Sequence, residues 1–176
     1  ILRANAVVVP VNPMNRAEEL KHYITDPAAR VAITTADLAP ELAKASNALP
    51  AGQGLRHLVA TQFTDAFDAP IAGDDAPPAA WHDWLCTAHP LPSLEGGQVH
   101  SWSDMLAGAD APPAHVVGPA DLAVLPYTSG TTGLPKGCMH LHRSIMHNAV
   151  ASSLWGNASA ENISLAVVPM FPITGM

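Results

Sequence analysis

The chain has 176 residues, which suffice for one ordinary domain with a hydrophobic core. Charged residues make up only 13% and the formal net charge is −7, which argues against non-specific nucleic-acid binding and against docking on an anionic membrane. No apolar run reaches the roughly 18 residues of a membrane span, and two cysteines do not form a disulfide framework, so we expect a cytoplasmic protein. The low charge suggests that the remainder of a longer polypeptide covers one face.

Residues 1–62 alternate between strand and helix patterns. In chain order, these patterns predict a strand at 6–11, a helix at 15–26, a strand at 31–34, a helix capped by Asp37 and a strand at 56–60. Strands that alternate with helices pair in parallel through right-handed crossovers. We therefore predict the α/β fold class, with a mostly parallel sheet and flanking helices.

Residues 63–120 differ in composition from the unit before them, being rich in Ala, Pro, Asp and Gly. This composition is typical of surface loops. Two stretches within it, 81–88 and 101–108, predict short helices. We expect these residues to form an insert between two ordered units, 1–62 and 121–176.

Residues 121–176 return to a regular pattern. In chain order, the pattern predicts a strand at 121–127, a short strand at 137–141, a helix at 142–155 and a buried strand at 163–170. The first two strands flank the loop "YTSGTTGLPKG", residues 127–137. The loop thus follows directly on a strand and has a helix behind it.

The composition of this loop suits a polyphosphate ligand. Its glycines let backbone N–H groups turn toward one centre, where they bind anions, while its hydroxyls add donors and its lysine adds charge. A Walker motif is excluded because, counting from Gly130, Pro135 stands where a second glycine is required, and Gly137 follows Lys136 in place of Ser or Thr. The dinucleotide pattern fails because Thr132 replaces its second glycine.

The motif resembles the phosphate-binding loop of the adenylate-forming (ANL) superfamily of AMP-binding enzymes, which comprises acyl-CoA synthetases, peptide-synthetase adenylation domains and firefly luciferase. The stretches "NAVVVPVNPMNRAEELKHYITDPAARVAIT", "HLHRSIMHN" and "VPMFPITGM" resemble segments of acyl-CoA synthetases in the same order. The resemblance implies that the chain is an internal piece of the large N-terminal domain of a fatty-acid–CoA ligase, without the C-terminal domain.

The resemblance also implies an activity and a phosphate site. Such a ligase uses ATP and Mg²⁺ to activate a carboxylic acid, here first of all a fatty acid, as an acyl-adenylate that is then transferred to coenzyme A. The residues expected to hold the β- and γ-phosphates of ATP, or to shape their loop, are Thr128, Ser129, Gly130, Thr131, Thr132, Gly133 and Lys136.

An acyl pocket is implied near the end of the chain, at Phe171, Pro172 and Gly175. Many members of the family carry a histidine or a bulky aromatic residue at the position of Pro172, where it gates the pocket, so the length of the acyl chain is not implied. The family's catalytic lysine and magnesium-binding motifs have no match in these residues. We therefore expect no catalytic residue and no metal ligand here, and predict that the chain alone does not complete adenylation.

Other interpretations stay open. The chain could come from an aryl-CoA ligase or a peptide-synthetase adenylation domain, or it could be a non-catalytic module that binds a nucleotide or another anion. The small-molecule carboxylate is the expected partner, and a homodimer is left open. A metal site at His140, His142 and His147 with Cys138 is disfavoured because no carboxylate completes a familiar ligand spacing.

Overall fold

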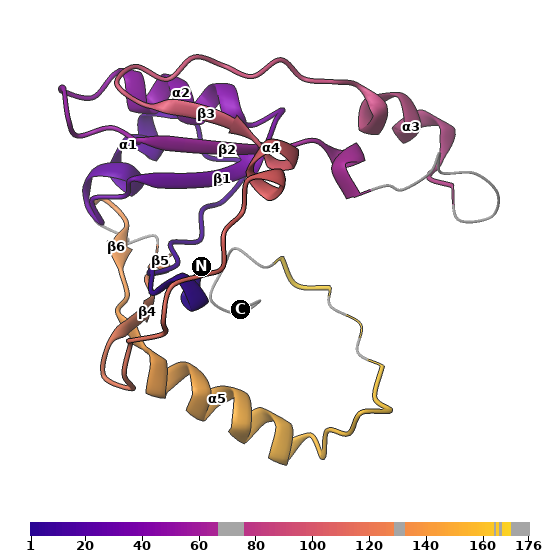
Figure 1. Ribbon diagram of the computed structural model, residues 1–176. Coiled ribbons are helices and arrows are strands. Elements are labelled where there is room, and N and C mark those ends of the chain that lie inside the picture. Colours follow the sequence, from indigo (N-terminus) through magenta and orange to yellow (C-terminus); the bar gives the residue numbers. More distant parts are fainter. Residues whose placement is uncertain (67–75, 129–132, 164, 166, 170–176) are drawn as a thin grey trace. The chain divides into compact units, whose positions relative to one another are not determined.

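The computed structural model describes residues 1–66, 76–128, 133–163, 165 and 167–169 (Figure 1). The chain divides into two compact units. One combines Ile1–Met14 with Ala111–Met176, and the other is Asn15–Asp110. In the part of the chain that is described, no helix is both long and apolar enough to cross a membrane.

The unit formed by residues 15–110 is built on a three-stranded sheet in the order β1-β2-β3. The strands are β1 (Val31–Thr35), β2 (His57–Thr61) and β3 (Gln98–Ser101), and both pairings are parallel. Val31 pairs with His57, which pairs in turn with Gln98, so the three strands start level with one another. The predicted α/β class with a parallel sheet is confirmed.

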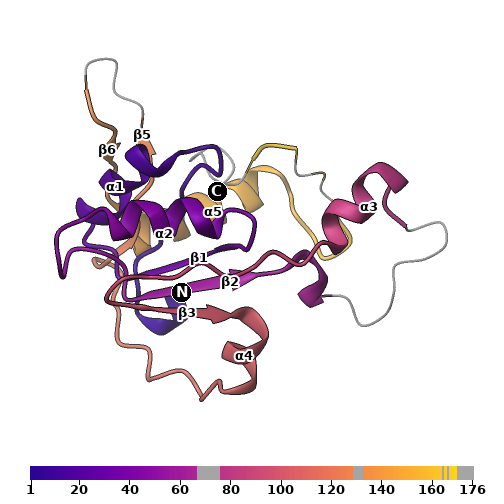
Figure 2. The same ribbon diagram turned by 90° about the horizontal axis from the view of Figure 1, so that it is seen from above.

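Two helices, α1 (Ala17–Thr25) and α2 (Ala39–Asn47), lie on the same side of this sheet (Figure 2). They are joined by a hydrogen bond from the Ala17 N–H to Glu41 Oε2, at 3.0 Å. Beneath them the Leu58 side chain of the central strand is fully buried, at 0% exposure. The hydrophobic core of this unit therefore lies between the two helices and one face of the sheet.

The opposite face of the sheet is only partly covered by the described residues. Val31 is 56% exposed and Ile33 is 50% exposed, although both carry β-branched apolar side chains. Parallel sheets are almost always covered on both faces. This exposed apolar face is therefore an unusual feature of the unit.

Short helices follow the second and third strands. The 3₁₀-helix η2 (Phe63–Ala66) comes after β2, and α3 (Ala79–Cys86) and α4 (Trp102–Ala107) correspond to the two short helices predicted within the insert. Ser101 caps α4, because its Oγ accepts a hydrogen bond from the Asp104 N–H at 3.1 Å.

The other unit contains small antiparallel pairings and one longer helix. Its elements are η1 (Leu2–Ala4), β4 (Leu122–Val124), β5 (Tyr127–Thr128), β6 (Lys136–Gly137), β7 (His140–Leu141) and α5 (His142–Trp155). Strand β4 pairs with β7, and β5 pairs with β6. The predicted helix at 142–155 is confirmed to the residue.

The predicted strand at 6–11 is reduced to a single parallel bridge between Val8 and Val124. The Val8 N–H donates to the Ala123 carbonyl at 2.9 Å, and the Val8 carbonyl accepts from the Leu125 N–H at 2.8 Å. Pro10 follows two residues later and has no N–H to continue the ladder. The prediction was therefore right that this segment pairs with a neighbour but wrong about its length as a strand.

The predicted strand at 163–170 does not form among the described residues of this stretch. Ile163 is 100% exposed and Val167 is 74% exposed. An apolar run becomes a strand when a neighbouring strand pairs with it and a layer covers it, and no described segment does either. The apolar pattern was therefore insufficient on its own.

One smaller prediction was also wrong, and one strand was missed. The N-cap of α2 is Leu38, with no side-chain capping bond, instead of Asp37. Strand β3, "QVHS", was not predicted at all because it has only four residues and three of them are polar. Its pairing with β2 is a contact between distant parts of the chain, which the pattern of neighbouring residues does not predict.

The buried centre of the sheet gives a test of this core. Leu58→Ala leaves a cavity under α1 and α2, and we expect it to lower the free energy of unfolding by about 2–5 kcal/mol. Leu154→Ala is the control, because Leu154 is 77% exposed on α5. Chemical denaturation followed by circular dichroism measures both, and equal losses for the two variants would contradict the assignment of the core.

Candidate functional site

The predicted phosphate loop is closed at its base by a two-stranded antiparallel ladder. Tyr127 lies opposite Gly137, and Thr128 lies opposite Lys136. Residues directly opposite each other in an antiparallel pair project to the same face. The ladder therefore brings one hydroxyl and one cationic side chain to the same side of the hairpin, eight residues apart in the sequence.

Close packing behind the ladder holds it in place. A Cβ added to Gly137 would lie 3.1 Å from two atoms of the Leu125 side chain and 3.3 Å from the Tyr127 ring, so a larger residue would force these side chains to shift by a few tenths of an ångström. One residue further on, the Cys138 N–H donates to the Pro126 carbonyl at 2.8 Å. From the sequence alone, Leu125 and Tyr127 were not predicted to support the loop. The sequence did contain a hint of this role, because an apolar and an aromatic side chain stand directly before the glycine-rich stretch.

A second ladder connects the hairpin to the core of its unit. Leu122 pairs with Leu141 and Val124 pairs with His140, with an irregularity between them. Ala123 and Val124 are buried, at 0% and 3% exposure. Both strands predicted beside the loop therefore exist, but each is divided in two. On one side the division falls at Pro126, which cannot donate a backbone hydrogen bond.

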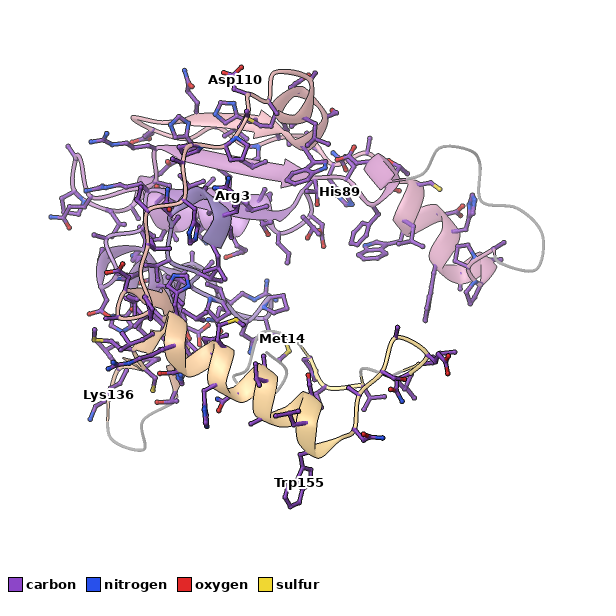
Figure 3. All side chains as sticks on the ribbon, turned by 60° about the horizontal axis from the view of Figure 1, so that its bottom comes forward. Arg3, Met14, His89, Asp110, Lys136 and Trp155 are labelled. Atoms are coloured by element: carbon purple, nitrogen blue, oxygen red, sulfur yellow. The ribbon has the colours of Figure 1, made fainter. Side chains whose placement is uncertain are left out.

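The charge of the hairpin is available to a ligand. Lys136 is exposed and extends outward from the hairpin (Figure 3). Among the described residues no carboxylate forms an ion pair with it. At Gly133, which precedes it by three residues, an added Cβ would meet no atom within 4 Å. The exit of the loop therefore offers an accessible cation beside open space.

The helix behind the loop contributes less to an anion site than its position suggests. The N–H groups at its start are already bonded: His142 donates to the Asp121 carbonyl and Arg143 to the Pro119 carbonyl, each at 3.0 Å. The free N–H groups at a helix start are what normally attract an anion. Anion binding here would therefore depend on the loop itself.

The structure brings together only part of the predicted phosphate site. It places Thr128 opposite Lys136 and describes Gly133 at the loop exit. Ser129, Gly130, Thr131 and Thr132 lie outside the described residues, as do the predicted pocket residues Phe171, Pro172 and Gly175. Their roles stay predictions.

The histidines around this hairpin do not gather into a larger site. The His142 ring meets the His115 ring edge-on, with 6.5 Å between centroids. Across the residues described, no group of three or more His, Cys, Asp or Glu side chains is arranged to hold a metal ion.

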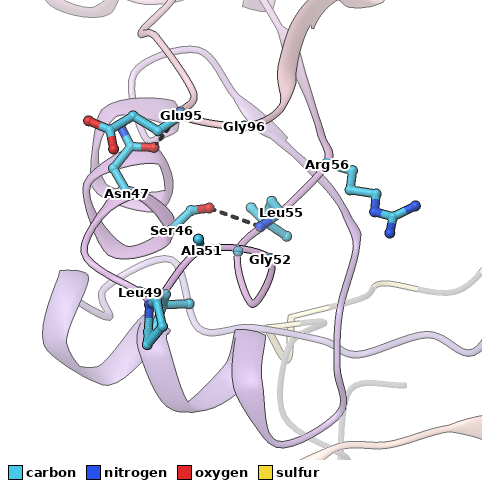
Figure 4. A pocket seen from close by; sticks show the side chains of 11 residues that line it. Ser46, Asn47, Leu49, Ala51, Gly52, Leu55, Arg56, Glu95 and Gly96 are labelled. Carbon is cyan, nitrogen blue, oxygen red and sulfur yellow. Dashed lines mark hydrogen bonds between the residues drawn. The ribbon is translucent and has the colours of Figure 1, made fainter.

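A pocket of about 330 Å³ lies in the other unit, between the end of α2 and the loops before β2 and β3 (Figure 4). Its polar side chains bond to the pocket's own backbone. Ser46 Oγ accepts from the Leu55 N–H at 2.9 Å, and Asn47 Oδ1 accepts from the Glu95 N–H at 2.8 Å. The Arg56 side chain extends away from the pocket in Figure 4. These contacts stabilise the loops and leave few groups for a ligand.

Comparison with known proteins gives the family context. A family model described as "AMP-binding enzyme" matches residues 1–176. The chain is 29% identical over 182 residues to a long-chain-fatty-acid–CoA ligase of Bacillus subtilis (strain 168), covering 100% of this chain and 30% of the ligase.

Two further relatives act on aromatic acids according to their names. A feruloyl-CoA synthase of Amycolatopsis sp. is 30% identical over 169 residues, covering 96% of this chain and 25% of the synthase. 4-Coumarate–CoA ligase 1 of Oryza sativa subsp. japonica is 38% identical over 89 residues, covering 44% of this chain and 16% of the ligase. The chain thus spans less than a third of the length of each of these relatives.

The exposed cation predicts a measurable anion affinity. We expect Lys136→Ala to weaken the binding of inorganic pyrophosphate by this chain on the order of tenfold, because a charge-assisted contact is lost. Lys44→Ala, which removes an exposed lysine from α2, is the matched control. Isothermal titration calorimetry at fixed ionic strength measures both. Equal affinities for Lys136→Ala and wild type would exclude Lys136 as a phosphate contact.

Proposed function

Because this chain belongs to the AMP-binding enzyme family, we propose that it forms the phosphate-binding part of an enzyme that activates a carboxylic acid with ATP. The carboxylate oxygen attacks the α-phosphorus of ATP. The bond between this phosphorus and the oxygen that links it to the β-phosphate breaks, so pyrophosphate departs and the acyl-adenylate remains. A coenzyme A thiol then displaces AMP and gives the acyl-CoA thioester.

The observation that carries this proposal is the pairing of Thr128 with Lys136 across the base of the loop. Negative charge develops on the β- and γ-phosphates as pyrophosphate departs, and donors fixed around the leaving group stabilise it. Lys136 would supply positive charge at the C-terminal end of the loop, and Thr128, paired with it, would fix the N-terminal end. Between them we assign contacts to Ser129, Thr131, Thr132 and Gly133, with Gly130 shaping the loop.

The residues of the hairpin do not fit a magnesium ion. Mg²⁺ prefers carboxylate and water oxygens, whereas the charged side chain of the described hairpin is the cation Lys136. We therefore derive no step through a metal held by these residues. Mg²⁺ is proposed only as the counter-ion that ATP carries, and coenzyme A as the acyl acceptor, both on family resemblance.

A fatty acid is the substrate class that we propose first, because the Bacillus relative named as a long-chain-fatty-acid–CoA ligase matches over the whole chain. An aromatic acid is the second candidate, because the relative named as a feruloyl-CoA synthase covers 96% of it at similar identity. The pocket that would discriminate between them is assigned to Phe171, Pro172 and Gly175, with Pro172 replacing the usual gating residue.

The wider organisation of the protein follows the same proposal. We propose that these residues belong to one domain, in which the segment 63–120 contributes β3 to the sheet begun in 1–62, the segment 121–176 carries the phosphate loop, and further polypeptide covers the face that carries Val31 and Ile33. Cys86 and Cys138 are both free thiols, which favours a reducing compartment such as the cytoplasm.

A non-catalytic anion-binding module is the alternative from a different class. It is supported by the same hairpin, because an accessible lysine beside a glycine-rich loop binds phosphate whether or not chemistry follows. Carboxylate-dependent exchange of pyrophosphate into ATP separates the two, since a binding module has no acyl-adenylate to reverse.

In the natural polypeptide that carries this chain, we expect Lys136→Ala to slow carboxylate-dependent pyrophosphate exchange on the order of 100-fold, as when one donor to a developing anion is removed. Carboxylate affinity should change far less, because the lysine contacts the leaving group. Lys44→Ala is the control. Unchanged exchange in Lys136→Ala would contradict the assignment, and no exchange in the wild-type polypeptide with any carboxylic acid of a broad panel would favour the binding module.

A further inference from the structure

Helix α3 carries a histidine and a cysteine side by side. His82 and Cys86 are four residues apart, so they lie on one side of the helix one turn from each other. His82 Nε2 is 3.8 Å from Cys86 Sγ. Both side chains are exposed, and Cys86 is a free thiol.

This pair has the chemistry and spacing of two zinc ligands. Zn²⁺ is bound by histidine nitrogen at about 2.0 Å and by cysteine sulfur at about 2.3 Å, which places the two atoms about 3.5 Å apart in a tetrahedral site. The observed 3.8 Å needs only a small rotation of either side chain. Imidazole and thiolate are also the ligands that zinc prefers in structural sites.

Asp83 lies close to the same ring. Its Oδ1 lies 3.7 Å from Nδ1 of His82, on the ring nitrogen that does not face the cysteine. Metal-binding histidines usually have a carboxylate or carbonyl at their other nitrogen, which orients the ring and fixes the proton there. At 3.7 Å the two groups are not hydrogen-bonded, but a small rotation of the exposed Asp83 side chain would bring it within hydrogen-bond distance of Nδ1 and orient the ring.

The pair faces away from the rest of its unit. Trp84 packs on Phe63 of η2, with ring centroids 4.6 Å apart, and this contact anchors α3. His82 and Cys86 are each two residues from Trp84, and two residues turn a helix by about 200°. Both ligands therefore lie on the side opposite the anchor, where a second molecule can approach.

One chain does not complete a zinc site. No third His, Cys, Asp or Glu joins the pair among the residues that the structure describes. We propose that α3 carries half of a Cys₂His₂ site, and that two copies of the chain share one Zn²⁺ through His82 and Cys86 of each. Two thiols lose their protons to solvent, so two thiolates and one Zn²⁺ make a neutral, four-coordinate centre.

The sequence on both sides of α3 contains acids and no lysine or arginine. No Lys or Arg lies between Arg56 and Lys136, whereas this stretch includes Asp83 and other acidic residues. Two copies would repel each other through these acids, and a divalent cation between them offsets the repulsion. The dimer is therefore expected to depend on zinc.

The test uses the whole chain, metal-free and kept reduced with a phosphine that excludes disulfides. Sedimentation velocity during titration with Zn²⁺ should show conversion from monomer to dimer, complete at one zinc per two chains and reversed by a chelator. Co²⁺ in place of zinc should give thiolate-to-cobalt charge transfer and the visible bands of a tetrahedral site, which reports on the ligands even without a change in mass.

Variants identify the ligands. Cys86→Ser should abolish the zinc-dependent dimer and the thiolate-to-cobalt charge transfer. His82→Gln should abolish the dimer and the tetrahedral cobalt bands. Asp83→Asn should weaken zinc affinity about tenfold and leave the ratio of zinc to protein unchanged. Cys138→Ser and His147→Gln are the matched controls and should keep both signals. The positions on α3 are exposed, so circular dichroism should match wild type.

Three results would overturn the proposal. The first is a zinc-dependent dimer that persists in Cys86→Ser. The second is a wild-type chain that stays monomeric and binds one zinc per chain as tightly as Cys86→Ser does. The third is the absence of any cobalt spectrum in the wild-type chain.

Discussion

The pairing of β5 with β6 is the constraint on which the candidate site depends. It joins Thr128 to Lys136 at the base of the glycine-rich loop, so a segment rich in small residues has fixed ends. The Gly137 backbone packs closely against Leu125 and Tyr127, so that an added Cβ would push on both side chains. A loop of this composition with free ends would lose more entropy on binding a phosphate. The hairpin provides preorganisation with very few residues.

The parallel sheet of the other unit shows the opposite situation, a core that is finished on one face only. Leu58 is fully buried under α1 and α2, whereas Val31 and Ile33 on the other face are about half exposed. Such a face gains stability when another layer covers it, at roughly 25 cal/mol per Å² of apolar surface. This arrangement agrees with a chain that spans less than a third of its relatives.

The apolar and polar periodicity of the sequence predicted those helices and strands that form without depending on a particular distant partner. Helix α5 and the strands β1 and β2 follow from apolar periodicity, and the loop was identified from its glycines, hydroxyls and lysine. The missed features depend on distant contacts. Strand β3 forms because "QVHS" meets β2, and 6–11 shrinks to one bridge at Val8 because Pro10 interrupts its ladder. The opposition of Thr128 and Lys136 likewise required the register of a hairpin that the sequence alone does not specify.

The most direct test of the central claim is residue-resolved nuclear magnetic resonance of this chain during titration with pyrophosphate. If the hairpin holds the polyphosphate, backbone amide resonances from Thr128 to Gly137 should shift in a saturable way, and the Lys136 side-chain signals should shift with them. Binding with saturable shifts elsewhere, such as around α3 or the pocket at Ser46, and none within this segment would contradict the account.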